Sequence, residues 1–174
     1  MSISDNLHEL IRGAQKVSSE DFQSIYNRYV DRLFAYVCSH VTERVSAKDI
    51  LQETFIDVWR ALPRFTYRSE EEFLGFLFVI VKRKLATHYK NEARYARVLS
   101  PLEVEPSAGD EHEYYHHLLS AVTNLTQQYQ EVVRLRYWGD LSFSEIGKTL
   151  GIGEGAARIM HHRALQKLKE ITPQ

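Results

Sequence analysis

Residues 141–170, LSFSEIGKTLGIGEGAARIMHHRALQKLKE, predict two helices joined by a tight turn. Ser142 and Glu145 have the S-x-x-E spacing of a capping box, in which two side chains satisfy backbone groups at the start of a helix. Gly151 suits the left-handed position that follows the last turn of a helix. A second helix is expected to begin near Glu154. This is the layout of a helix-turn-helix, whose second helix enters the major groove of DNA.

The second helix of this pair is rich in cationic and imidazole side chains, which favour a nucleic-acid partner: Arg158, His161, His162, Arg163, Lys167 and Lys169. Basic residues near the C-terminal end of a helix also stabilise its dipole without any ligand. From this segment alone, both interpretations stay open.

Composition fits one domain or two small ones. The chain has 174 residues, of which 44% are hydrophobic and 11% aromatic, enough for real cores. The single cysteine, Cys38, excludes an intrachain disulfide and a site built from several cysteines, so we expect a reducing, cytoplasmic location. We expect no signal peptide, because no basic segment precedes an apolar run at the N-terminus, and no membrane insertion, because the apolar stretches are short.

The charges are unevenly distributed, although the net charge is only −1. Residues 63–100 hold 8 basic and 4 acidic side chains, and residues 118–174 hold 7 and 5. Residues 101–117 hold 5 acidic side chains and no Lys or Arg. Two positive segments separated by an acidic one are compatible with DNA binding, because local charge sets the electrostatic footprint.

The predicted fold class is all-α, because apolar residues recur at helical spacing almost throughout. Ser46 and Ser69 are the expected N-caps of the second and third helices. Two prolines, a glycine and acidic residues at 99–112 predict a flexible acidic linker. The chain is thus expected to form two small helical domains, 10–98 and 113–172, with helices over residues 19–40, 46–62, 70 to 94 or beyond, 113–125, 127–138, 142–150 and 154–170.

No enzymatic site is expected, because the chain has no nucleophile motif, Gly-rich phosphate loop or paired-carboxylate signature. The histidine pairs at 116–117 and 161–162 are adjacent, so neither pair places both rings on one helix face. We therefore expect no metal site and no cofactor.

Two segments together resemble bacterial sigma factors. Residues 49–59, DILQETFIDVW, are similar to the family pattern D-L-x-Q-E-x-F-x-x-x-W, and residues 125–168 are similar to the promoter-reading C-terminal domain. Their order and the linker resemble the short extracytoplasmic-function (ECF) class, which keeps two domains. The resemblance covers about four-fifths of the chain. It implies a protein that binds core RNA polymerase and directs promoter-specific initiation.

The spacing of Asp49, Gln52, Glu53 and Asp57 places four polar side chains on one helix face. Spacing alone favours an ordinary solvated face. The resemblance implies that this face binds the clamp helices of the polymerase β′ subunit.

The helix after Ser69 combines aromatic and basic residues, a pattern that suits single-stranded DNA because bases stack on rings while cations follow phosphates. The resemblance implies that this helix and the loop at 64–69 capture the melted minus-ten element, with a flipped base held in a pocket. Core packing of the aromatics is the alternative. Phe76 and Arg83 replace the usual Trp and Asn of the family, which implies an unusual minus-ten preference. The candidate residues are Phe76, Lys82, Arg83, Lys84, His88, Tyr89 and Lys90.

For the helix-turn-helix, the resemblance implies contacts to the minus-thirty-five element. Arg158 is the best candidate for base or phosphate contacts, and Ala156 suits a thymine methyl group. Lys148 is expected on a phosphate, which positions the protein without specifying sequence. The candidate residues are Ser144, Lys148, Glu154, Ala156, Arg158, His162 and Arg163.

The resemblance also implies the polymerase β flap and an anti-sigma factor as partners. Two other hypotheses remain: a stand-alone helix-turn-helix regulator, and a sigma-like decoy that sequesters an anti-sigma factor. The polar face at residues 49–57 argues against the first, since such a regulator does not need it.

Overall fold

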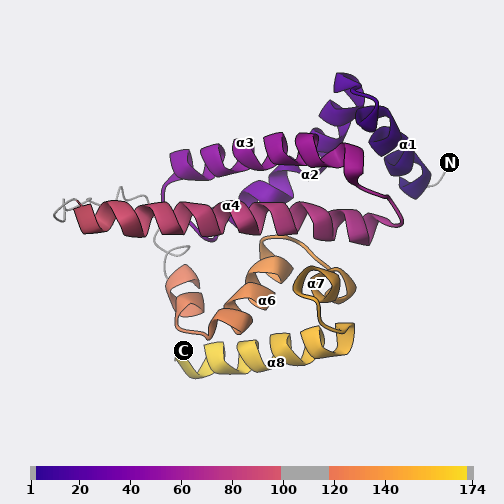
Figure 1. The fold of residues 1–174 in the computed structure, drawn as a ribbon. Coiled ribbons are helices and arrows are strands. Elements are labelled where there is room, and N and C mark those ends of the chain that lie inside the picture. The colour runs from indigo at the N-terminus through magenta and orange to yellow at the C-terminus, as the bar shows by residue number, and fades with distance from the viewer. Residues whose placement is uncertain (1–2, 99–117, 172–174) are drawn as a thin grey trace.

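The computed structural model describes residues 3–98 and 118–171, and every regular element in these residues is helical (Figure 1). The predicted linker at 99–112 and the start of the next predicted helix at 113–117 lie outside the described residues. The elements are α1 (Ile3–Gln15), α2 (Ser19–Cys38), α3 (Arg44–Ala61), the short 3-10 helix η1 (Leu62–Arg64), α4 (Glu70–Val98), a helical segment at 118–123, α6 (Gln127–Tyr137), α7 (Phe143–Leu150) and α8 (Glu154–Ile171).

Helix α1 was not predicted from the sequence. Leu7, Ile11 and Ala14 follow one another at helical spacing and are almost completely buried. The Gln15 amide donates hydrogen bonds to the carbonyl oxygens of Leu62 (3.1 Å) and Phe65 (2.7 Å). Helix α1 is therefore fixed to the turn that connects α3 to α4.

Helices α2, α3 and α4 form the N-terminal part of the core. The expected N-cap of α4 is confirmed, because the Glu72 N–H donates to the Ser69 hydroxyl at 3.2 Å. The expected N-cap of α3 is wrong: α3 begins at Arg44 after Glu43, and Ser46 lies inside its first turn. The Ser46 hydroxyl instead donates to the Glu43 carboxylate, which gives it a local partner within the helix.

The helix-turn-helix prediction is confirmed. The Ser142 N–H donates to the Glu145 carboxylate (2.6 Å), and the Glu145 N–H donates to the Ser142 hydroxyl (3.2 Å). Helix α7 ends at Leu150 and is followed by Gly151, whose φ of 69° lies in the left-handed region. Helix α8 then begins at Glu154, as expected.

The two halves of the chain pack directly against each other across α4. Figure 1 shows α4 between α3 on one side and α6 and α7 on the other, and one continuous hydrophobic cluster includes Phe78 of α4 and Ile146 of α7. A side chain at Gly139 would lie 3.1 Å from the Phe78 ring and 2.8 Å from the Leu135 carbonyl. The absence of a side chain at Gly139 thus permits this close approach.

We expect Gly151→Ala to destabilise the protein by about 1–2 kcal/mol, because an L side chain disfavours the left-handed backbone by that amount. Gly155→Ala, in the first turn of α8, is the control, since its added Cβ meets no atom within 4 Å and its φ is not positive. Urea unfolding of the full chain followed by circular dichroism compares the two. Equal unfolding free energies for both variants would contradict this role of Gly151.

Candidate protein and DNA interfaces

The polar side chains of α3 lie together on the surface, as their spacing predicts. Asp49, Gln52 and Glu53 are exposed and Asp57 is half-buried. On the other faces of the helix, the side chains of Ile50, Leu51, Thr54, Phe55 and Val58 are buried. The helix thus presents one polar face while its apolar residues hold it in the core.

Two of these carboxylates are already held by α4. The Lys84 ammonium lies 2.7 Å from the Asp57 carboxylate and 3.5 Å from that of Glu53. The hydrogen bond to Asp57 is the largest cause of the raised pKa of Lys84, which keeps the ammonium charged. Lys84 was predicted to contact minus-ten DNA. In the structure it binds two carboxylates of the polar face of α3.

An apolar groove of about 680 Å³ runs between α2 and α3, beside the polar face. Aromatic pairs line it: Phe22 packs on Trp59 (4.7 Å between ring centroids) and Tyr26 on Phe55 (4.5 Å). Ile56 also lines the groove, with 41% of its surface exposed, and Gln52 belongs to both the groove and the polar face. This open groove was not predicted from the sequence.

The residues of α4 predicted to bind minus-ten DNA do not share one face. Lys82 pairs with Glu131 of α6 at 3.1 Å, whereas Lys84 faces α3. Arg83, between them, is exposed. Consecutive residues differ by about 100° around a helix, so these three side chains have different surroundings. Tyr89 faces His40, and His88 pairs with Glu92 at 3.4 Å.

A second hollow, of about 510 Å³, lies between the end of α3, η1 and α4. Phe76 and Arg83 line it, and Phe76 packs on Phe65 with 4.6 Å between ring centroids. Arg60 and Arg64 line it as well. Of these two, Arg64 belongs to the loop that the resemblance indicated, whereas Arg60 was missed.

The predicted minus-thirty-five residues lie mainly on the exposed side of α8. Ala156, Arg158, His162 and Arg163 are exposed. Arg158 bonds to the Glu154 carboxylate at 2.6 Å and lies over the Phe143 ring at 4.8 Å.

Two further candidates belong to α7. The ammonium of Lys148, predicted to contact a phosphate, is bound to the carboxylate of Glu71 on α4. Ser144 is half-buried. The helix that was expected to meet the DNA backbone is therefore also the helix that packs on α4.

His161 belongs to an aromatic cluster and was not a candidate. Its ring lies 5.2 Å from Phe143 and 5.6 Å from Tyr137, and its Nε2 is 3.2 Å from the Tyr137 hydroxyl. Burial, followed by the charges of Arg136 and His162, lowers the pKa of His161. These contacts hold the middle of α8 against α6 and α7.

Within residues 3–98 and 118–171, no group of three or more His, Cys, Asp and Glu side chains is placed to hold a metal ion. Over the same ranges, no helix combines the length and apolar character needed to cross a bilayer.

Comparison with known proteins identifies both halves. Residues 25–95 match the family described as Sigma-70 region 2, and residues 121–170 match Sigma-70, region 4. The chain is 32% identical to the ECF RNA polymerase sigma factor BldN of Streptomyces coelicolor over 99% of this chain and 68% of that protein. It is 30% identical to the RNA polymerase sigma factor CarQ of Myxococcus xanthus, over 88% of this chain and 90% of that one.

A solved structure supports the fold. CnrH, in complex with the cytosolic domain of CnrY, superposes with a TM-score of 0.75 at 20% identity, covering 95% of this chain and 96% of that chain. The matched regions, their order and the identity to these relatives agree with one another. The chain belongs to the ECF family of RNA polymerase sigma factors.

Proposed function

We propose that this sigma factor acts in the cytoplasm by docking residues 10–98 on core polymerase and minus-ten DNA and residues 113–172 on the minus-thirty-five element. The polymerase performs the chemistry. The observation that supports this most strongly is the polar face of α3 beside an apolar groove, because the stand-alone regulator does not need such a surface.

The polymerase-binding surface combines both features. Gln52 supplies an exposed polar group at the groove, and Ile56 and Trp59 supply apolar area. Asp49 is exposed one helical turn before Gln52 on the polar face. Protein interfaces typically join a buried apolar centre to a polar rim. Glu53 and Asp57 add to this surface mainly as an ordered pair of carboxylates, because Lys84 holds both in place.

For the unpaired base of the minus-ten element, we propose the hollow at Phe76. Phe65 and Phe76 offer rings for stacking, and Arg60, Arg64 and Arg83 surround them with positive charge. This combination suits an unpaired base attached to a phosphate backbone. Arg83 donates hydrogen bonds but does not accept them, so the base it favours presents an acceptor.

For the minus-thirty-five element, the proposal places the exposed side of α8 in the major groove, with Arg158 on a base edge. Ion pairing to Glu154 orients the guanidinium before DNA arrives. We also propose that an anti-sigma factor controls the protein. The solved complex of the sigma factor RpoE with the anti-sigma factor NepR from Bartonella quintana, of the same fold (TM-score 0.65), gives a precedent.

The direct test is run-off transcription with purified chain and bacterial core polymerase on the upstream DNA of its own gene. Specific initiation is expected. Polymerase binding without initiation on any fragment would favour the decoy that sequesters an anti-sigma factor. Operator binding by the chain alone, without polymerase binding, would favour the stand-alone regulator.

Replacing Asp49 and Gln52 together with Ala is expected to weaken polymerase binding about 10- to 100-fold, because each lost polar contact costs of order 1 kcal/mol. Glu20→Ala with Gln23→Ala is the matched control, since these residues are also exposed, lie on α2 and have the same i, i+3 spacing. Titration of labelled polymerase measures both. Equal losses in the two double variants would exclude a specific role for the α3 face.

Arg158→Ala is expected to cost about 1–3 kcal/mol in holoenzyme binding to the native promoter and little on a promoter with a scrambled minus-thirty-five element. Lys169→Ala, in the last turn of α8, is the control and is expected to affect both promoters equally. Competition binding at fixed salt measures the four affinities. Uniform weakening by Arg158→Ala would assign it to phosphate contact instead.

A further inference from the structure

Ion pairs join the two halves of the chain at their interface. At one end, Lys148 of α7 pairs with Glu71 of α4. At the other end, Lys82 of α4 pairs with Glu131 of α6. In both cases a lysine predicted to contact DNA is bound by a carboxylate from the opposite half.

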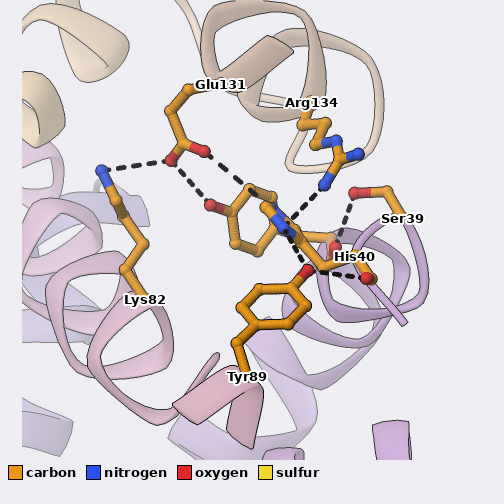
Figure 2. Close-up of polar contacts among 7 residues, drawn as sticks. Ser39, His40, Lys82, Tyr89, Glu131 and Arg134 are labelled. Carbon is orange, nitrogen blue, oxygen red and sulfur yellow. Dashed lines mark hydrogen bonds and ion pairs between the residues drawn. The ribbon is translucent and has the colours of Figure 1, made fainter. Parts of the chain in front are cut away.

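The second of these contacts belongs to a larger polar cluster, shown in Figure 2. The Glu131 side chain is only 16% exposed, and its Oε1 accepts a hydrogen bond from the Tyr36 hydroxyl at 2.7 Å as well as the Lys82 ion pair. His40 follows α2 and lies between Glu131 and Arg134 of α6. Residues of α2, α4 and α6 thus meet in one polar cluster.

Hydrogen bonding fixes the protonation state of His40. The Arg134 Nη1 lies 2.7 Å from the His40 Nδ1, and a guanidinium donates only, so Nδ1 carries no proton. The proton of the neutral ring is therefore on Nε2, which faces the Glu131 carboxylate at 3.9 Å and is buried without a hydrogen-bond partner. The Tyr89 hydroxyl donates to the His40 carbonyl oxygen at 2.7 Å.

A second proton on His40 is incompatible with this arrangement. It would sit on Nδ1 and point at the Arg134 guanidinium. The groups that face His40 are Arg134 and Glu131 from α6, Lys82 and Tyr89 from α4, and Tyr36 from α2. Burial, followed by the charges of Arg134 and Lys82, lowers the pKa of His40 from 6.5 to about 3.

We propose that this cluster is an acid-sensitive clasp that holds the helix-turn-helix half closed on α4 and releases it when His40 becomes protonated. The role in transcription rests on the proposed function, because release frees Lys82 and Lys148 for DNA. The clasp itself is a property of the free chain.

The direction of the pH effect follows from linkage. Opening removes Arg134 and exposes His40 to water, so the pKa of His40 is expected to return towards its ordinary value, whereas the closed form binds the proton only at much lower pH. The equilibrium constant for closure therefore has its full value above about pH 6.5. It falls about tenfold per pH unit between there and about pH 3. From about pH 7.5 to about pH 5.5, the ratio of open to closed molecules is expected to rise about tenfold.

Single-molecule energy transfer measures this ratio in the full chain. Dyes are placed on Gln23→Cys in α2 and Gln166→Cys in α8, both exposed positions, with Cys38→Ser to remove the native thiol. The same measurement is made with Lys148→Ala, which removes the ion pair at the other end of the interface. This loss weakens closure, so that enough open molecules are present to be counted.

His40→Asn is the decisive variant, since its side-chain oxygen replaces the acceptor for Arg134 and does not titrate. It is expected to abolish the rise at low pH, whereas His8→Asn, at an exposed histidine on α1, is expected to retain it. Glu131→Gln is expected to raise the open fraction at both pH values. Circular dichroism verifies that each variant is folded.

An unchanged ratio between the two pH values in both labelled proteins would overturn the proposal, as would a rise in His40→Asn equal to that of the parent. Adding core polymerase and promoter DNA is expected to give the open form, and persistence of the closed form in a transcribing complex would equally overturn it. Failure to bind polymerase at all would overturn the proposed function, while the measurement on the free chain would still decide the clasp.

Discussion

The packing of α4 on both of its sides is the interaction on which the rest of the structure depends. Helix α4 has 29 residues, and its side chains Phe73, Leu77 and Phe78 are completely buried. One side of the helix completes the core with α2 and α3, and the other receives α6 and α7. Helices α6 and α7 have 11 and 8 residues, lengths at which isolated helices are marginal in water. Their stability therefore depends on tertiary contacts, which α7 makes mainly with α4 and α8 and α6 mainly with α8.

Local signals allowed much of the fold to be predicted. The capping box at Ser142 and the left-handed Gly151 involve only neighbouring residues, so their sequence pattern was sufficient. The N-cap of α3 was predicted wrongly for a local reason, because α3 begins after Glu43, whose side chain makes no capping hydrogen bond. Helix α1 was not predicted, because its burial depends on what the chain meets after folding. The close approach at Gly139 has the same origin: a glycine after a helix resembles an ordinary helix end, and its contact with Phe78 comes from residues far away in the sequence.

The candidate sites show the same division. Spacing correctly placed the polar residues of α3 on one face, because a helix repeats regularly. On α4, residue type and resemblance indicated which residues were candidates for DNA contact. They did not indicate which neighbouring helix each side chain faces. Lys82, Arg83 and Lys84 are neighbours in sequence, yet one pairs with α6, one lines a hollow and one pairs with α3. A basic run on a buried helix thus serves several purposes, and only the neighbouring helices determine which residue serves which.

The ion pairs between the two halves have a consequence for the free protein in a cell full of DNA. Binding to arbitrary DNA is driven by lysines and arginines that displace counterions from phosphates. A chain whose Lys82 and Lys148 are already neutralised by its own carboxylates offers less of this attraction. The genome presents a vast excess of such competing sites. Closure would therefore leave more of the protein in solution, available to polymerase, instead of distributing it along the chromosome.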